Sequence, residues 1–511
     1  MRKLIVLFLL AGALCSANNN SEFKPKQANI AFTINLNDRS DDTFKVKVTV
    51  PKLDTENNIF QFASTAPGTY QVMDMGRYVQ SFIALDKKGR MIRTTQISTN
   101  QFEISKPKKV RTIIYEIAET YDTPVTENSI YPMAGSSIED DHAIINGQTV
   151  FGYLKGLQDL PMKITIERPE SWKMGTALTP NSEGILIADN YDHVVDSPIL
   201  LGKLSKASTK VSNTIIDVYS YSTNDKIEAQ QALESVENMI TSADKFLGGL
   251  PVDHYTFLLF FETNPLSPKG AWEHSYSSFY VYDENTWENI ETSFKHVASH
   301  EFFHVVTPLN IHSEIIEEFN FIEPIPSQHL WLYEGVTEWA AHAMMYCADI
   351  HTDESYFMEL RRKVYIDSNY FDADYSLLDL ALKSYTEEGH KQYSNIYMRG
   401  ALVAGLLDIR LLELSNGEVG LIDVIKKMAK TFGPNTPFDE ATFFEYFTNE
   451  TYPEIADFFE LYVKNTNELP LEEYYAKIGV SFNSEAVTFG FSETPTKEQL
   501  DLRRKWMKKL D

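Results

Sequence analysis

Two histidines and a glutamate near the middle of the chain have the types and the spacing of a metal site. His300, Glu301 and His304 form the pattern H-E-x-x-H. In a helix, residues four apart lie on one face, so the two imidazoles can bind one metal ion. Glu301 then lies beside the open coordination position, where a carboxylate can take a proton from an activated water. The pattern predicts a hydrolytic metal centre, although a helix with two buried or polar histidines would give the same letters.

A catalytic zinc usually has three protein ligands and one open position, so the motif lacks one ligand. Glu334, in the stretch L-W-L-Y-E-G-V-T, follows His304 by 30 residues. That interval allows a loop and an antiparallel helix to return to the metal. Glu338 lies one helical turn further on, where it can accept a hydrogen bond from a ligand histidine and fix its tautomer. A solvated charge on the helix surface is the alternative interpretation of Glu338.

The pairing of residues 300–304 with residues 330–337 resembles the gluzincin metallopeptidases, and most closely the glycyl aminopeptidase family, metallopeptidase family 61. Two further segments agree with this resemblance. Residues 270–274, G-A-W-E-H, are similar to the glycine-rich motif of that family that ends in Glu-His, and to the G-A-M-E-N motif of related aminopeptidases. Residues 394–403, S-N-I-Y-M-R-G-A-L-V, resemble a family segment in which a tyrosine precedes a basic residue and a glycine.

The resemblance implies a role for one residue in each of these two segments. Glu273 would bind the free α-amine of the substrate, and Tyr397 would hydrogen-bond the developing oxyanion. Taken alone, Glu273 could be an ordinary loop carboxylate and Tyr397 a packing or capping residue. The resemblance also implies Glu301 as the general base and one zinc ion per chain, whose three protein ligands are His300, His304 and Glu334.

The resemblance extends to the first part of the chain, with two departures elsewhere. Residues 66–70, A-P-G-T-Y, and residues 196–199, D-S-P-I, are similar to landmarks of the N-terminal domain of the family. The family often has Trp-Asn soon after the second histidine, where this chain has V-V-T-P-L-N-I-H, so the preference for glycine stays open. Many members carry a PDZ domain, whereas about 40 residues follow Leu469, too few to hold one.

Residues 28 to 215 have the pattern of β-strands. Turn-forming residues such as A-P-G at 66–68 punctuate them. Many short strands with few helical patterns predict a β-sandwich, which we expect in residues 18–215. Apolar and polar side chains alternate, with the period of a half-buried strand, in residues 31–36, 44–50, 101–105 and 112–117.

The pattern changes near residue 225. Apolar residues at spacings of three and four predict a helix over residues 226–247, and the apolar run 255–261 predicts a strand buried on both faces. Residues 278–282 predict a second strand. With the resemblance, this favours a multidomain α+β fold: the β-sandwich, a thermolysin-like α/β zinc-peptidase domain over 216–375 and a helical region over 376–511. Helical patterns dominate after residue 288, in residues 330–348, 356–365, 399–414, 443–447 and 455–462.

Composition and charge exclude some classes of protein. The 511 residues are 43% hydrophobic and 23% charged, which is typical of globular rather than disordered chains. The 72 acidic and 46 basic side chains give a net charge of −26. Such a surface repels phosphate backbones, and no basic stripe offsets it, so we expect no nucleic-acid partner.

The first 17 residues have the pattern of an export signal. Two basic residues precede the apolar run 4–13, which is too short for a permanent membrane helix, and Ser16-Ala17 offers a small-residue cleavage site. The alternative is a lipoprotein anchored through Cys15, although Leu14 stands where that signal prefers a small residue. Cleavage leaves Cys347 as the single cysteine, so we expect no intrachain disulfide. No later stretch has the apolar length of a membrane helix.

The sequence therefore predicts an exported zinc aminopeptidase, periplasmic or extracellular, that acts on peptide substrates. Two alternatives remain open. One is a zinc endopeptidase on the same site, which would make no use of Glu273 as an amine anchor. The other is an exported binding protein whose β-rich half recognises a partner and whose metal site is vestigial. Oligomeric state and the preferred N-terminal residue are not encoded in any of these motifs.

Overall fold

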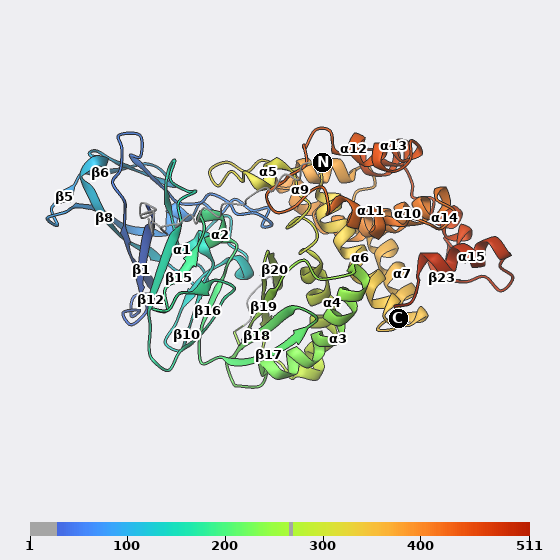
Figure 1. Ribbon diagram of the computed structural model, residues 1–511, viewed down its shortest axis with the longest axis horizontal. Coiled ribbons are helices and arrows are strands. Elements are labelled where there is room, and N and C mark those ends of the chain that lie inside the picture. Colours follow the sequence, from blue (N-terminus) through green and yellow to red (C-terminus); the bar gives the residue numbers. More distant parts are fainter. Residues whose placement is uncertain (1–27, 265–268, 511) are drawn as a thin grey trace, which may run out of the picture.

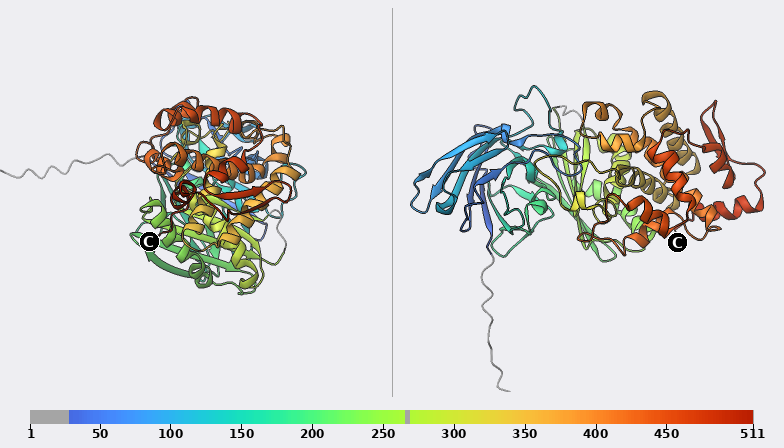
Figure 2. Two further views of the ribbon diagram at one scale, coloured as in Figure 1. Left: turned by 90° about the vertical axis from the view of Figure 1, so that its right-hand side faces the viewer. Right: turned by 90° about the horizontal axis from the view of Figure 1, so that it is seen from above.

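A computed structural model of the protein describes residues 28–264 and 269–510. The expected leader and Cys15 lie outside the described residues. An N-terminal β region, a central α/β unit and a helical C-terminal region follow one another along the long axis of the molecule (Figures 1 and 2). The predicted fold class is confirmed.

Three sheets make up the N-terminal region. The largest has eight strands in the order β14-β15-β12-β1-β2-β8-β4-β5, and two four-stranded sheets run β13-β16-β10-β9 and β11-β3-β7-β6. Inward-facing side chains of all three sheets, such as Phe32, Phe60 and Ile145, form one hydrophobic core. In β1 every second residue is buried, as the alternation predicts.

The strands of these three sheets have the following bounds: β1 (Ile30–Asn35), β2 (Thr43–Thr49), β3 (Ile59–Gln61), β4 (Val79–Asp86), β5 (Met91–Ile92), β6 (Thr94–Ser98), β7 (Gln101–Ile104), β8 (Val110–Ala118), β9 (Ser137–Ile138), β10 (His142–Ile145), β11 (Tyr153–Leu154), β12 (Met162–Glu167), β13 (Lys173–Gly175), β14 (Thr179–Pro180), β15 (Leu186–Ala188) and β16 (Ile199–Gly202). Two short helices, α1 (Gly147–Val150) and α2 (Tyr191–Val195), lie between them in the chain.

The central unit is built on a five-stranded sheet in the order β17-β18-β19-β21-β20. Strands β18, β19 and β21 are parallel, and β17 and β20 are antiparallel edge strands. Residues 255–261 of β19 are all buried, as their continuous apolar run predicts. The strands are β17 (Ser205–Val211), β18 (Thr214–Ser222), β19 (His254–Glu262), β20 (Gly270–His274) and β21 (Ser277–Asp283).

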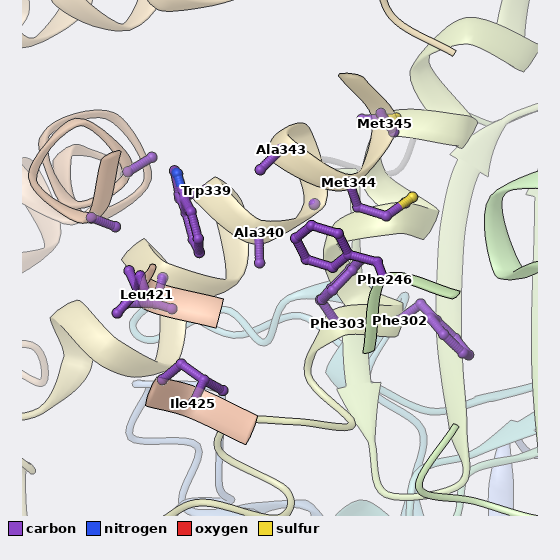
Figure 3. Close-up of a cluster of buried hydrophobic side chains, with 14 of the residues drawn as sticks. Phe246, Phe302, Phe303, Trp339, Ala340, Ala343, Met344, Met345, Leu421 and Ile425 are labelled. Carbon is purple, nitrogen blue, oxygen red and sulfur yellow. The ribbon is translucent and has the colours of Figure 1, made fainter. Parts of the chain in front are cut away.

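Helices α3 (Ala229–Leu247) and α4 (Trp287–Phe303) belong to this unit. Helix α3 ends at Gly248, whose φ of 78° is a left-handed conformation that glycine adopts without strain. Figure 3 shows side chains of α3, α4, α6 (Thr337–Cys347) and α11 (Leu421–Met428) in one apolar cluster, with Phe246 and Phe303 near Met344. Burial of this cluster holds α4 and α6 together, and these helices carry the motif residues.

The C-terminal region is mostly helical but contains a two-stranded hairpin, β22 (Val480–Asn483) and β23 (Thr488–Phe491), which the helical prediction lacks. Phe482 and Phe489 pair across it at 4.6 Å between ring centroids, so cross-strand packing stabilises strands too short for a clear period. No helix within residues 28–264 and 269–510 has the length and apolarity to cross a membrane. The remaining helices are α5 (Glu314–Glu317), α7 (Asp353–Tyr370), α8 (Leu377–Leu382), α9 (Glu387–Gln392), α10 (Asn395–Leu414), α12 (Phe443–Glu450), α13 (Glu454–Phe459), α14 (Leu471–Lys477) and α15 (Lys497–Trp506).

Candidate active site

The two motif histidines lie at the C-terminal end of α4. Phe294, Ala298 and Phe302 of this helix are buried in the core. His300 lies in the last turn, and His304 is the first residue after the helix. Both histidines are buried, and their Nε2 atoms are 3.1 Å apart. The structure thus brings the two imidazoles to one point.

Glu334 reaches the same point from a π-helical turn, η4 (Trp331–Val336). Its Oε2 lies 3.3 Å from His300 Nε2 and 3.6 Å from His304 Nε2. The apolar run predicts one regular helix over residues 330–348, whereas the π turn occupies its first part and α6 the rest. Apolar periodicity over six residues does not distinguish a π turn from an α turn, and π turns are frequent at functional sites.

Two glycines allow η4 to cross α10 at very short range. A Cβ added to Gly335 would lie 2.8 Å from backbone atoms of Gly400, and one added to Gly400 would lie 2.9 Å from the Cα of Gly335. Any side chain at either position would push the two elements apart. The crossing also positions Tyr397, one turn before Gly400, so that its ring lies 5.4 Å from that of His300.

The donor set formed by His300, His304 and Glu334 fits a tetrahedral zinc ion. Two imidazole nitrogens and one carboxylate oxygen are common zinc donors. With metal–ligand distances near 2.0–2.2 Å, tetrahedral geometry separates ligand atoms by roughly 3.3 Å. The observed separations of 3.1, 3.3 and 3.6 Å agree with that value. The three residues offer three ligand atoms and leave the fourth position to water or substrate.

Hydrogen bonds to the other ring nitrogens set the tautomers that this donor set requires. His304 Nδ1 donates to the carbonyl oxygen of Thr307 at 3.1 Å, and His300 Nδ1 donates to Oε2 of Glu338 at 2.8 Å. Nε2 is therefore the nitrogen of each ring that faces the position of a cation. Burial lowers the pKa of His304 to about 4, so its imidazole is neutral at neutral pH, as a metal ligand must be.

Glu338 lies behind His300, and a buried lysine on α7 neutralises it. Lys363 is 1% exposed and donates to Oε1 of Glu338. His342 Nε2 lies 3.7 Å from the same carboxylate oxygen. Burial alone would raise the pKa of Glu338, but Lys363 and the neighbouring histidines hold it well below its usual range. Glu338 is thus a buried anion in contact with His300 rather than a solvated surface charge, and no sequence pattern pointed to Lys363.

Two further carboxylates meet at this site. One oxygen of Glu301, one of Glu273 and a ring nitrogen of His304 all lie within 4.8 Å of one another. Glu273 comes from β20, the edge strand, while Glu301 comes from the last turn of α4. Burial raises the pKa of Glu301 to about 7, within the range suited to proton transfer at neutral pH. Burial also raises the pKa of Glu273, and the charges of Glu334 and Glu301 add to this shift.

The N-terminal region contributes to the site through residues 66–70, whose sequence predicts a turn and resembles a landmark of the family. A Cβ added to Gly68 would lie 2.4 Å from Oε1 of Glu273, and Trp272 Nε1 donates to the carbonyl of Pro67 at 3.2 Å. The ring of Tyr70 lies 5.3 Å from that of Tyr393. A sequence signal existed, namely the run A-P-G-T-Y, but such a run indicates only a turn.

A cleft of about 1050 Å³ adjoins the site. Its walls include Gly68 and Tyr70 of the N-terminal region and Glu273 of β20, but none of the three candidate metal ligands. His312, which had no motif role, also lines it, and its Nε2 lies 2.8 Å from Oε2 of Glu317. A chain that lies in this cleft would therefore approach the metal-binding residues past Glu273.

Comparison with known protein families gives two matches. Residues 31–203 match a family model described as the Peptidase M61 N-terminal domain, and residues 293–403 match one described as M61 glycyl aminopeptidase. The two matched regions together span more than half of the chain. A search among curated proteins found no similar sequence.

Three solved structures illustrate the similarity of fold. An aminopeptidase N family protein from Idiomarina loihiensis is 20% identical with a TM-score of 0.77, over 88% of this chain and 78% of its own. An M1 zinc metallopeptidase from Deinococcus radiodurans is 11% identical with a TM-score of 0.53, over 87% and 95%. Yeast LTA4 hydrolase in complex with bestatin is 14% identical with a TM-score of 0.54, over 87% and 68%. At these identities the likeness shows the fold.

Proposed function

The chain belongs to the M61 glycyl aminopeptidase family of metallopeptidases, and on that premise we propose that it is an exported aminopeptidase with one zinc ion, which removes N-terminal residues from peptides. One observation carries the proposal: the carboxylate of Glu273 lies within 4.8 Å of Glu301 and His304. A carboxylate so near the reacting position can bind a free α-amine. Gly68 of the N-terminal loop lies against the same carboxylate.

Each residue of the site has one task in the proposed reaction. When bound, zinc supplies a Lewis acid that polarises the scissile carbonyl and makes water acidic enough to act as a nucleophile. A carboxylate oxygen of Glu301 accepts the proton of the attacking water and passes a proton to the leaving amine. Glu273 holds the substrate ammonium group by a charge-assisted hydrogen bond. The hydroxyl of Tyr397 donates to the carbonyl oxygen as negative charge develops on it.

The outer contacts keep these groups in place. Glu338 and the carbonyl of Thr307 orient the imidazoles of His300 and His304. The salt bridge between Lys363 and Glu338 keeps that carboxylate charged in a buried position. The basic and apolar leader at residues 1–17 supports export, with lipid attachment through Cys15 as the alternative form.

A substitution at Glu273 distinguishes the proposed aminopeptidase from the endopeptidase and binding-protein alternatives. Glu273→Ala is expected to lower kcat/KM for free-amine peptides. The corresponding loss of transition-state stabilisation is roughly one to three kilocalories per mole, the range for a hydrogen bond to a charged group. Wild-type protein should strongly prefer free to N-acetylated aminoacyl substrates, and this ratio should fall toward one in the variant. The measurement is the hydrolysis of matched free and acetylated pairs at equal zinc occupancy.

Glu317→Gln is the matched control, because this carboxylate lines the same cleft and contacts His312 rather than the metal-binding residues. It should keep the ratio of the wild type. Equal cleavage of acetylated and free substrates by the wild type would contradict the aminopeptidase proposal and support the endopeptidase alternative. Zinc binding without hydrolysis of either substrate would favour the binding protein.

Metal content tests the donor set directly. The purified protein is expected to hold about one zinc per chain, since three protein ligands and an open position are typical of a catalytic site. Glu334→Gln should weaken zinc binding by at least about tenfold, because an amide is a poorer ligand than a carboxylate and even loss of an outer-shell partner costs 10–100-fold. Metal analysis after dialysis against graded chelator measures the loss. Full occupancy in this variant would remove Glu334 from the ligand set.

A further inference from the structure

A second group of carboxylates lies in the N-terminal region, far from the candidate active site in the chain. Glu119 follows β8 directly, Asp122 is three residues further on, and Glu139 lies in the turn between β9 and β10. One carboxylate oxygen of each lies within 4.8 Å of the others. Neither the family comparison nor the proposed reaction gives these residues a role.

Glu119 differs from Asp122 and Glu139 because it is buried, so it is not simply part of an acidic surface. Its side chain is 0% exposed. Its Oε2 accepts a hydrogen bond from the backbone N–H of Ile138 at 2.7 Å, whereas Oε1 is buried and has no hydrogen-bond donor among the described residues. A buried carboxylate oxygen without a partner is costly, so a proton or a bound cation must satisfy it.

Negative charge predominates around Glu119. No lysine or arginine within the described residues forms an ion pair with Glu119, Asp122 or Glu139. Asp42 and Asp141 add further negative charge around Glu139. Burial, together with the neighbouring Asp122 and Glu139, raises the pKa of Glu119 to about 9. Three uncompensated carboxylates at such short range are stable when a cation lies between them.

We propose that Glu119, Asp122 and Glu139 bind a calcium ion. All three donors are oxygens, which hard divalent cations prefer, and no histidine or cysteine belongs to the group. Calcium–oxygen distances of 2.3–2.6 Å let one ion bridge oxygens up to roughly 5 Å apart, and calcium tolerates irregular geometry. Magnesium requires near-ideal octahedral geometry with distances near 2.1 Å. Asp122 is exposed, so the ion has access from solvent and water can complete its coordination.

Binding would stabilise the place where the N-terminal region meets the central sheet. Tyr121, between two of the ligands, has its ring 6.1 Å from that of Phe260 on β19. The hydroxyl of Tyr221 on β18 donates to Asp141, next to the turn of Glu139, at 2.9 Å. An ion that joins the end of β8 to the β9–β10 turn therefore fixes both contacts. The expected consequence is stability, without a role in the reaction.

Calcium titration of the zinc-loaded, full-length protein tests this site. At about 100 times its dissociation constant, calcium should raise the Tm by roughly 3 °C or more, since a ligand that binds only the folded state stabilises it by mass action. Terbium should bind in place of calcium and emit on excitation of tyrosine, because Tyr121 lies between Glu119 and Asp122 in the sequence. Added calcium should displace the terbium and remove this emission. Asp122→Asn should abolish both responses, and it changes an exposed residue whose loss does not threaten folding.

Two variants complete the experiment. Glu119→Gln should lose the calcium response while its Tm in calcium-free buffer equals or exceeds that of the wild type, because a neutral amide needs neither a proton nor a cation at this buried position. Glu183→Gln, an exposed carboxylate in a turn of the same region, should keep the full response. A wild-type Tm that is insensitive to millimolar calcium, with no calcium-displaceable terbium signal, would overturn the proposal in favour of a shared proton between Glu119 and Asp122. An equal response to magnesium would overturn the assignment to calcium. None of these readouts depends on peptidase activity.

Discussion

Replacement of Glu301 by glutamine is expected to lower kcat by about 10²- to 10⁴-fold, the usual contribution of a general acid–base group. The substitution keeps the size and shape of the side chain but removes its ability to accept a proton. Glu301 is buried in the last turn of α4, and its pKa is raised to about 7, so a neutral amide costs the fold little. Its carboxylate does not belong to the set formed by His300, His304 and Glu334, so zinc content should stay near one per chain.

The measurement is single-turnover hydrolysis of a free-amine dipeptide, with zinc content and Tm determined on the same sample. Glu317→Gln again provides a glutamate-to-glutamine control in the same cleft. A loss of less than about tenfold in kcat would mean that another group accepts the proton. Loss of zinc in the Glu301 variant would instead place this carboxylate among the metal ligands.

Tyr397→Phe should lower kcat by about 10²- to 10³-fold, the usual cost of removing one oxyanion donor. The ring of Tyr397 packs against His300 at 5.4 Å and against Tyr393 at 5.9 Å, and phenylalanine preserves both contacts. The bond from this hydroxyl to the carbonyl oxygen strengthens as charge develops there, so the effect should appear in kcat while KM changes little. Steady-state kinetics on a free-amine substrate series separates the two parameters.

Tyr393→Phe is the matched control for this prediction. The hydroxyls of Tyr393 and Tyr397 are 3.5 Å apart, and both rings lie in the same aromatic group beside Tyr70. Loss of the Tyr393 hydroxyl should have a much smaller effect, because Tyr397 is the one whose ring lies against His300. A normal kcat with a lower Tm in Tyr397→Phe would assign this tyrosine to packing.

Local periodicity explains why so much of the architecture could be predicted. The alternation in residues 31–36 and 44–50 corresponds to β1 and β2, and the apolar run 255–261 to the buried strand β19. In each case the pattern records which faces of one element are covered, and that information is contained in the element itself. The hairpin β22–β23 escaped prediction because its stability comes from a cross-strand aromatic pair, a contact between residues of different strands.

The same limit applies at the candidate site. Residues whose partners lie within one helical turn carry a signal, as His300 and His304 do. Lys363 carries none, because its partner Glu338 lies 25 residues away on another helix. The run that contains Gly68 and Tyr70 signals a turn but not its partners, since Glu273 and Tyr393, which it contacts, lie in different regions of the chain. The π turn that holds Glu334 was equally hidden, because a π turn and an α turn have nearly the same apolar pattern.

By itself, the sequence determined the family, the order of β-rich and helical regions and the metal-binding residue types, because motif spacing and apolar periodicity are properties of short segments. Only the tertiary structure decided how those segments meet. It placed the N-terminal loop against Glu273, buried Lys363 beside Glu338 and set η4 against α10 through Gly335 and Gly400. It also brought Glu119, which follows β8, close to Glu139 in the turn between β9 and β10. These contacts join residues far apart in the chain, and they form only when burial of the shared core brings whole elements together.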